Sequence, residues 1–400
     1  RRALPTMGEE FQVLSRRTLA GRGGWTSRPR PFAGRPREPL ARAGRRCASR
    51  PVRAVALAFL GTALACGSTN GRSPPLGAPM TGLAPGTWTW VGFEDSSCSD
   101  GSPTGIGVNP GEGPDLLFFL DGGGACASAE TCFVLHTATL GPFGEGEFEA
   151  RVAESPGSIL DRNLAGNPFA DATLVYVPYC TGDVHGGDRV VTYTDGPGGT
   201  MHHTGHLNIL AFLARVAATY PAPRRLVVTG SSAGGFGTLV NYQTFRSYFP
   251  GAEGFLVDDS GPPLESNGGP LIQAGFASWG IADVLDPLCG GPGLCEADLS
   301  KGLLALLRKY PSDRFGLLSW NADPTISAYY GISVSTFTSD LTALVSDVLA
   351  PSANGRAFVA VGSTHTMLGD PGSVAQNGVG LLPWLGAEVG GSAGFASETP

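Results

Sequence analysis

The sequence predicts an α/β fold: a single domain with a doubly wound, mostly parallel sheet flanked by helices. Two observations favour this class. From about residue 86 to 383, short unbroken apolar runs alternate with amphipathic stretches of helical length. Such runs are typical of strands buried on both faces of a parallel sheet, and an alternation of this length forms one domain. We expect strands at 116–120, 174–178, 226–229, 255–257, 315–320 and 358–361, and helices at 205–219, 233–248, 270–285, 301–310 and 338–349.

The composition indicates a loop-rich globular domain. Glycine (60 residues) and proline (32) are abundant, whereas charged residues make up only 15% and hydrophobic ones 42%, which excludes a highly charged disordered chain. Residues 1–53 are rich in arginine and carry a net charge of +11, which leaves −18 for residues 54–400. An acidic folded part argues against nucleic acid as a partner, because phosphate binding requires clustered lysine and arginine.

The amino-terminal residues carry an export signal. Residues 1–53 lack hydrophobic periodicity, which indicates a disordered or wrongly started extension. Residues 54–66 begin with an apolar run that is too short to span a bilayer but is typical of a secretory signal peptide. Small residues before Cys66 resemble a bacterial lipobox, which makes Cys66 a candidate for lipidation, with ordinary cleavage near Ala65 as the alternative. The expected remaining parts are a flexible tether (67–85), the folded domain (86–383) and a small-residue tail (384–400).

Six further cysteines predict disulfides, because an even number in an exported chain is typical of a disulfide framework. Two pairs are close enough in sequence to close small loops, which leaves the last two cysteines to pair. No CxxC pair occurs, which argues against a zinc ribbon. The predicted disulfides are Cys126–Cys132, Cys289–Cys295 and Cys98–Cys180.

One motif carries most of the chemistry: residues 230–234 (GSSAG) fit G-x-S-x-G. The motif follows the expected strand 226–229 and opens the expected helix 233–248. This is the context of the nucleophile elbow in α/β-hydrolase-like folds, where the serine lies on a strained turn with glycine on both sides. Ser232 is therefore the candidate nucleophile. The alternative is a tight turn whose serine only caps the helix, and Ser231 lacks the matching glycines.

A nucleophilic serine needs an acid and a histidine, which follow it in that order in hydrolases of this type. His365 is the one histidine after Ser232, in a loop just beyond the strand 358–361, and is the candidate general base. Asp323 lies just past the strand 315–320, at the same edge of the sheet, and is the candidate acid, although it could also be a simple turn or cap residue. The competing aspartates are Asp259, as second choice, and Asp258, Asp313, Asp340 and Asp347.

Catalysis by such a serine also requires hydrogen-bond donors that stabilise the negative oxygen formed during the reaction. The expected strand 116–120 leads into three successive glycines, and such loops supply backbone donors opposite the elbow in lipases and esterases. The candidate donors are the backbone N–H groups of Gly123, Gly124 and Ala233. The alternative is a flexible turn, since glycine is frequent in this chain.

Several short motifs follow one another along the chain: 97–103 (SCSDGSP), 119–126 (FLDGGGAC), 175–187 (VYVPYCTGDVHGG), 229–237 (TGSSAGGFG), 258–264 (DDSGPPL), 321–323 (NAD) and 363–365 (STH). In combination they resemble those of the pectin acetylesterase and Notum family of α/β-hydrolases. This resemblance implies Ser232, Asp323 and His365 as the catalytic triad and also pairs Cys98 with Cys180. The chain departs from the family pattern at Ala125, where members often have an aromatic residue, and at 262–263 (PP), so the substrate does not follow from the resemblance.

A metal site is the alternative for the histidine-rich segment MHHTGH, which contains His202, His203 and His206. His202 and His206 would share a helix face, with Asp183 and His185 near in sequence. The segment lacks the glutamate of H-E-x-x-H, however, and the family resemblance places Asp183 and His185 beside the active-site mouth in a hydrogen-bonding role. We therefore expect no metal and no cofactor.

These features predict a secreted or periplasmic bacterial serine carboxylesterase, tethered to the membrane if Cys66 is lipidated. The expected substrates are acetyl esters of a polysaccharide or of small alcohols, hydrolysed through an acyl-enzyme. Two other functions remain open: a non-catalytic binding module on the same fold, and a carboxylesterase for long acyl groups.

Overall fold

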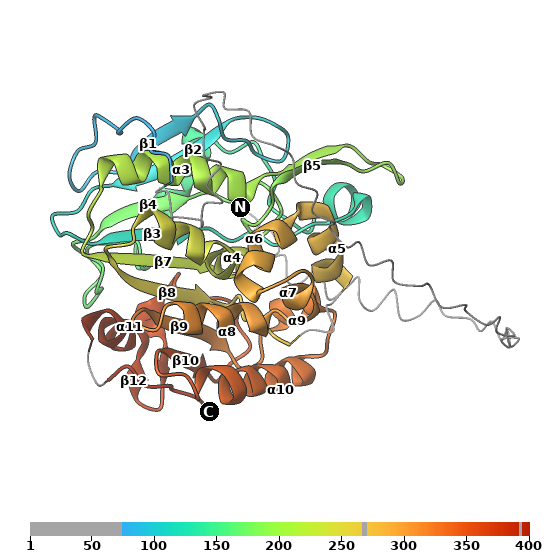
Figure 1. The fold of residues 1–400 in the computed structure, drawn as a ribbon. Helices are drawn as coiled ribbons and strands as arrows, with labels where there is room; N and C mark the ends of the chain where they lie inside the picture. Colours follow the sequence, from blue (N-terminus) through green and yellow to red (C-terminus); the bar gives the residue numbers. More distant parts are fainter. Residues whose placement is uncertain (1–73, 266–269, 392–393) are drawn as a thin grey trace, which may run out of the picture. The chain divides into compact units, whose positions relative to one another are not determined.

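The computed structural model describes residues 74–265, 270–391 and 394–400, which contain an eight-stranded sheet of order β1-β2-β4-β3-β7-β8-β9-β10 (Figure 1). All neighbours from β4 to β10 are parallel, whereas β1 and β2 are added antiparallel at one edge. The predicted fold class is confirmed. The strands are β1 (Thr89–Phe93), β2 (Thr104–Asn109), β3 (Leu116–Leu120), β4 (Thr173–Val177), β7 (Arg225–Ser231), β8 (Glu253–Asp259), β9 (Arg314–Trp320) and β10 (Gly355–Ala360).

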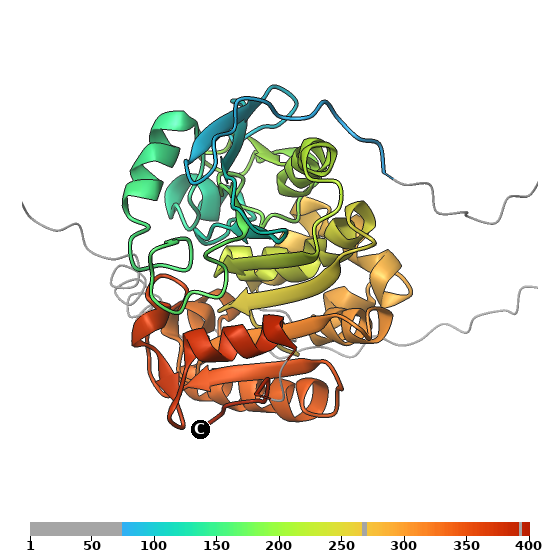
Figure 2. The same ribbon diagram turned by 90° about the vertical axis from the view of Figure 1, so that its left-hand side faces the viewer.

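Helices cover both faces of the sheet. They are α2 (Glu145–Ala153), α3 (Gly205–Thr219), α4 (Ala233–Tyr248), α5 (Pro270–Trp279), α6 (Ile281–Cys289), α7 (Leu294–Ala297), α8 (Ser300–Lys309), α9 (Pro324–Tyr330), α10 (Val334–Leu344) and α11 (Leu381–Gly390). Successive strand side chains point to opposite faces. Val228 and Leu256 therefore join the core under α3, α4 and α8, while Val227 and Phe255 join the core under α11. Figure 2 shows the chain progressing from one end of the sheet (blue and green) to the other (red).

The six expected strands are present with slightly different ends, but the sequence did not reveal β1, β2 or the hairpin of β5 (Arg189–Thr192) and β6 (Thr200–His203). In β2, two glycines interrupt the apolar signal. A Cβ at Gly107 would lie 2.0 Å from the Phe148 ring, so this glycine makes room for α2. The helix expected at 270–285 is two helices, α5 and α6, separated by Gly280 with a φ of +76°.

Described structure continues past both expected limits of the folded domain. Helix α11 crosses residue 383, and the chain after it pairs with β10 through a hydrogen bond from the Val359 N–H to the Glu398 oxygen (2.7 Å). In the expected tether, Met80 is buried and its N–H donates to Thr219 Oγ1 (2.8 Å) on α3. The expected extension, the signal peptide and Cys66 lie outside the described residues.

Three disulfides join the predicted cysteines: Cys98–Cys180, Cys126–Cys132 and Cys289–Cys295. The first ties the loop after β1 to the end of β4, and the second closes the loop that follows the glycine run. Cross-links of this kind are typical of proteins from oxidising compartments. Among the described helices, none has the length and apolar character needed to span a bilayer.

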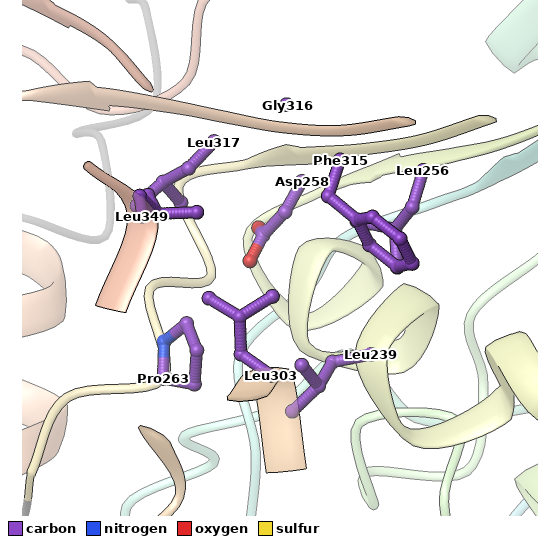
Figure 3. Close-up of a pocket in the computed structure, with 9 residues that line it drawn as sticks. All are labelled: Leu239, Leu256, Asp258, Pro263, Leu303, Phe315, Gly316, Leu317 and Leu349. Carbon is purple, nitrogen blue, oxygen red and sulfur yellow. The ribbon is translucent and has the colours of Figure 1, made fainter. Parts of the chain in front are cut away.

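Two carboxyl groups are buried on opposite faces of the sheet. Asp258 lies on β8 and faces a small cavity of about 10 Å³ between the sheet, α4 and α8 (Figure 3). Burial raises the pKa of Asp258 to about 8. Glu388 lies on α11, and no hydrogen-bond partner for either of its carboxyl oxygens is found among the described residues. Burial raises the pKa of Glu388 well above its usual value of 4.5.

Glu388 therefore predicts a pH-dependent stability. Because its pKa is raised on folding, its protonated form contributes stability that is fully present below pH 4.5 and is lost as the pH rises towards the folded pKa. Glu388→Gln cannot ionise at this position. Its free energy of unfolding is therefore expected to rise relative to that of the native protein by about 1.4 kcal/mol per pH unit in that range. Urea unfolding at pH 5 and pH 8 measures this, with exposed Glu149→Gln as the control. If the unfolding free energies of Glu388→Gln and the native protein differ by the same amount at both pH values, a neutral Glu388 is contradicted.

Candidate active site

Ser232 lies on the sharp turn between β7 and α4. Its φ of +59° and ψ of −118° place it in a backbone region that non-glycine residues rarely adopt, and its N–H donates to the Asp259 carbonyl oxygen (2.7 Å). Both flanking glycines are required by close packing. A Cβ at Gly230 would lie 2.6 Å from the Leu120 carbonyl oxygen, and one at Gly234 would lie 1.9 Å from the same atom. The turn has the strained geometry of a nucleophile elbow.

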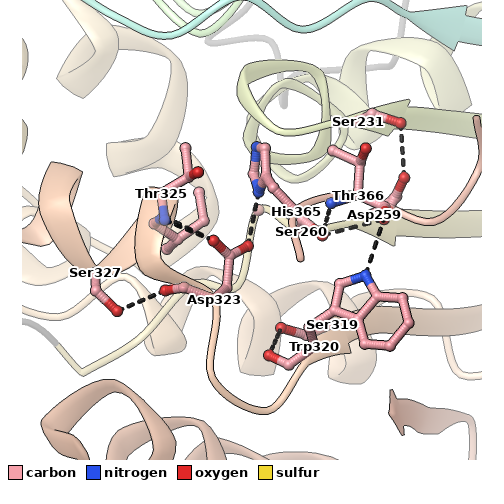
Figure 4. Close-up of polar contacts among 12 residues, drawn as sticks. Ser231, Asp259, Ser260, Ser319, Trp320, Asp323, Thr325, Ser327, His365 and Thr366 are labelled. Atoms are coloured by element: carbon pink, nitrogen blue, oxygen red, sulfur yellow. Dashed lines mark hydrogen bonds and ion pairs between the residues drawn. The ribbon is translucent and has the colours of Figure 1, made fainter. Parts of the chain in front are cut away.

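Asp323 and His365 meet at the carboxyl edge of the sheet (Figure 4). His365 Nδ1 lies 2.7 Å from Asp323 Oδ2, and because a carboxylate can only accept, the Nδ1 carries the proton. Asp323 is also the N-cap of α9: its Oδ1 accepts from the N–H groups of Thr325 (2.8 Å) and Ile326 (3.1 Å). The Asp323 side chain is 0% exposed and that of His365 is 23% exposed. A buried, helix-capping carboxylate therefore fixes the orientation and tautomer of the imidazole.

The other nitrogen, His365 Nε2, is shielded from solvent and has no hydrogen-bond partner within the described parts of the chain. With the proton on Nδ1, this atom carries the free lone pair and can accept a proton. The Ser232 hydroxyl does not reach it at hydrogen-bond distance in this structure. Such contacts often tighten only when substrate binds.

Asp259, the second choice for the acid, does not contact His365 Nδ1. Its carboxylate accepts instead from the Ser231 hydroxyl (2.7 Å) and from the backbone N–H groups of Met367 (2.9 Å) and Leu368 (3.0 Å). Asp258 also lies away from the imidazole, in the apolar surroundings of Figure 3. The structure therefore places Asp323 next to His365 Nδ1, and it places Asp259 and Asp258 elsewhere.

The glycine loop lies directly against the elbow. A Cβ at Gly122 would approach Ser232 Cβ to 3.1 Å. The φ angles of Gly123 (+153°) and Gly124 (+74°) lie in the region that favours glycine. Among the described residues, no acceptor is found for the backbone N–H groups of Gly123, Gly124 or Ala233. The part of the chain that the structure describes thus leaves these three candidate donors without an acceptor, which is the state that an oxyanion site requires.

Tyr329, on α9, packs against this loop. Its hydroxyl donates to the Thr137 carbonyl oxygen (2.5 Å) and contacts the backbone of Ala125, and burial raises the pKa of Tyr329 to about 12. A Cβ at position 124 would come within 2.1 Å of the Tyr329 hydroxyl oxygen. The tyrosine thereby fills space next to Ala125, where the sequence lacks an aromatic residue.

The first residue of the loop, Asp121, is held by contacts of its N–H group, its carbonyl oxygen and its carboxylate. Its N–H donates to the Val177 oxygen (3.0 Å), and its carbonyl oxygen lies 2.9 Å from His185 Nε2. Its carboxylate accepts from the Tyr176 hydroxyl (2.5 Å) and pairs with Arg151 (3.3 Å). Burial lowers the pKa of His185, so this imidazole is neutral at neutral pH and donates one hydrogen bond to the loop. This contact is a hydrogen-bonding role of the kind that the family resemblance implies for His185, whereas no sequence pattern indicated the anchoring of Asp121.

The other histidines do not share one site. His202 lies in β6 and His206 in α3, so the expectation that they share a helix face is wrong. His203 contacts the Thr181 carbonyl oxygen (2.9 Å), and His206 contacts the side chain of Asn241 (2.7 Å). Within the described ranges, no cluster of three or more histidine, cysteine, aspartate or glutamate side chains could hold a metal ion.

A mostly parallel sheet with an elbow after β7 and an Asp–His pair after β9 and β10 defines the class of α/β-hydrolase folds. The structure resembles that of the Wnt deacylase Notum from Drosophila, with a TM-score of 0.57 and 17% identity over 76% of this chain and 93% of that chain. A family model described as pectinacetylesterase matches residues 91–267. Over these residues the chain is similar to the pectinacetylesterase/Notum family, in agreement with the resemblance of its sequence motifs.

Curated relatives include proteins named as palmitoleoyl-protein carboxylesterases and proteins named as pectin acetylesterases. The palmitoleoyl-protein carboxylesterase notum1' of Xenopus laevis is 28% identical over 173 residues, which cover 41% of this chain and 34% of that protein. Pectin acetylesterase 4 of Arabidopsis thaliana is 27% identical over 158 residues, which cover 38% of this chain and 37% of that protein. The chain thus spans about a third of the length of these relatives. The family match includes Ser232 and ends before Asp323 and His365.

Proposed function

We propose that this protein is a serine carboxylesterase with Ser232 as nucleophile, His365 as general base and Asp323 as the residue that orients the base. The observation that carries the proposal is the Asp323–His365 hydrogen bond at the sheet edge where the strained Ser232 turn also lies. The glycine loop against Ser232 adds donors for the oxyanion. This arrangement favours an enzyme over a non-catalytic binding module, which needs neither a strained serine nor an oriented imidazole.

The proposed reaction proceeds in two steps. The Ser232 hydroxyl oxygen attacks the ester carbonyl carbon while its proton moves to His365 Nε2, and the N–H groups of Gly123, Gly124 and Ala233 hold the negative oxygen. The tetrahedral intermediate expels the alcohol, which takes the proton from Nε2, and an acyl-serine remains. Water then gives a proton to Nε2 as its oxygen attacks the acyl-serine. The second tetrahedral intermediate releases the carboxylic acid, and the leaving Ser232 oxygen takes the proton back from Nε2. Asp323 stays ionised throughout.

The proposed substrates are acetyl or other short acyl esters of a polysaccharide or of small alcohols, met outside the cytoplasm. The match to a protein named pectin acetylesterase and the three disulfides support this assignment. Other relatives are named palmitoleoyl-protein carboxylesterases, so an ester with a long acyl group is the alternative substrate. Acyl length is therefore the property to measure first.

We expect kcat/KM on 4-nitrophenyl esters to peak at about two to four acyl carbons and to fall at least tenfold by about eight. The physical reason is the filled space around the oxyanion loop, where Tyr329 packs against Gly124 and Ala125. Each methylene that the site excludes forfeits up to about 0.8 kcal/mol of transfer free energy. A maximum at eight carbons or beyond would support the long-acyl alternative.

A pair of variants tests the part that Tyr329 plays in this profile. Tyr329→Ala removes the ring and is expected to move the maximum to longer acyl chains. Tyr329→Phe keeps the ring and removes only the hydroxyl that bonds Thr137, so the maximum should stay in place. If both variants keep the native profile, another wall of the site sets the acyl length.

A further inference from the structure

The carboxylate of Asp259 lies between the two turns that carry the proposed nucleophile and base. It is fully buried at the end of β8, next to the end of β7. On one side it accepts from the Ser231 hydroxyl (2.7 Å), one residue before the nucleophile. On the other side it accepts from the N–H groups of Met367 (2.9 and 3.0 Å, to its two oxygens) and Leu368 (3.0 Å), two and three residues after the base.

Further hydrogen bonds from the same end of β8 reach the same two turns. The Asp259 carbonyl oxygen accepts from the Ser232 N–H (2.7 Å). The hydroxyl of Ser260 accepts from the Thr366 N–H (3.2 Å) and donates to Asp259 Oδ1 (3.1 Å). Figure 4 shows Ser231, Asp259, Ser260 and Thr366 joined by dashed lines beside His365, apart from the Asp323 contact. The elbow and the histidine turn are thus both hydrogen-bonded to Asp259, and the histidine turn also to Ser260, although the two turns lie more than 130 residues apart in the chain.

We propose that Asp259 is a positioning residue, which holds the Ser232 elbow and the His365 turn at the separation that proton transfer requires. This inference rests on the proposed function. Asp259 does not contact the imidazole Nδ1, and it acts through the Ser231 hydroxyl and the main chain of the two turns. A displacement of about 1 Å between reacting groups can cost about 10²-fold in rate, so a rigid connection between the turns matters for kcat.

Asp259→Asn is a sensitive probe of this network. Each carboxylate oxygen of Asp259 accepts from a backbone N–H, so either orientation of an asparagine amide would point its NH₂ group at a backbone donor. The neighbouring Asp258→Asn is a matched control. Asp258 accepts one backbone bond, from the Gly261 N–H (2.8 Å), and an asparagine oxygen can keep that bond. Burial favours the neutral acid at Asp258, which an amide imitates in charge and size.

The experiment compares kcat and KM of the two variants and the native protein on 4-nitrophenyl acetate, per folded protein measured by circular dichroism. We expect Asp259→Asn to lower kcat by about 10²-fold with KM within about threefold, and to slow labelling by a fluorophosphonate by a similar factor. Asp258→Asn should stay within about threefold of the native protein in all three quantities. Equal kcat values for the two variants would overturn the proposal.

A second variant keeps the test decisive if Asp259→Asn does not fold. Ser231→Ala removes one donor to the carboxylate and leaves the backbone bonds, so kcat should fall by about fivefold with KM unchanged. An unchanged kcat in Ser231→Ala would then count against the proposal. Failure of the proposed function looks different: the native protein itself would hydrolyse no ester and would not react with the fluorophosphonate.

Discussion

Replacing Ser232 with alanine is expected to lower ester hydrolysis by about 10⁴-fold or more while the protein stays folded. The variant loses the atom that attacks the carbonyl, and only the oxyanion donors and substrate binding remain. Alanine is smaller than serine, and the Ser232 hydroxyl makes no hydrogen bond within the described residues, so folding should not suffer. Initial rates on 4-nitrophenyl acetate and circular dichroism measure the two quantities.

The control for this variant is Ser247→Ala, an exposed serine near the other end of α4. It should keep native activity. His365→Ala should cost about as much as Ser232→Ala, and the double variant little more, because residues that act as one unit have non-additive effects. Near-native activity in Ser232→Ala would contradict the assigned nucleophile, and additive losses would show that the two residues act separately.

The strands that are buried on both faces could be predicted because their apolar runs are unbroken, as in 116–120 and 226–229. β1 and β2 could not, because they form the antiparallel edge and glycines interrupt β2. The tail after residue 383 contains small residues, yet it covers the open edge of β10, with Trp384 donating to the Ala396 oxygen (2.6 Å). Edge pairing by backbone groups depends little on side-chain type, so composition does not reveal it.

Residues of the candidate active site could be predicted where the chemistry requires one residue type next to a recognisable strand or turn. Ser232 lies in a strand–turn–helix motif, and Asp323 and His365 each follow a strand at the expected edge. The contacts of Asp259 and Asp121 could not be predicted in this way. Their partners are mainly backbone groups and residues remote in sequence, such as Met367 for Asp259. Only the packed sheet shows which turns these carboxylates join.

Asp323→Asn is the second substitution with a very large expected effect. The asparagine oxygen can keep the N-cap bonds to Thr325 and Ile326, because asparagine caps helices as well as aspartate does. Its NH₂ group then faces His365 Nδ1 and donates to it, so the imidazole must carry its proton on Nε2 instead. With Nε2 protonated, His365 cannot accept the Ser232 proton, and kcat should fall by about 10⁴-fold.

The fold should tolerate this change, because the cap is kept and the site loses a charge without losing volume. A thermal unfolding midpoint within a few degrees of the native value would show that the loss is chemical. Asp347→Asn is the control: this aspartate also follows Ser232 in the chain, but it lies exposed in the turn after α10 and should keep activity within about twofold. If Asp323→Asn keeps more than a tenth of the native kcat, the imidazole is oriented by another group, and the Asp323–His365 contact is no more than a link between α9 and the histidine turn.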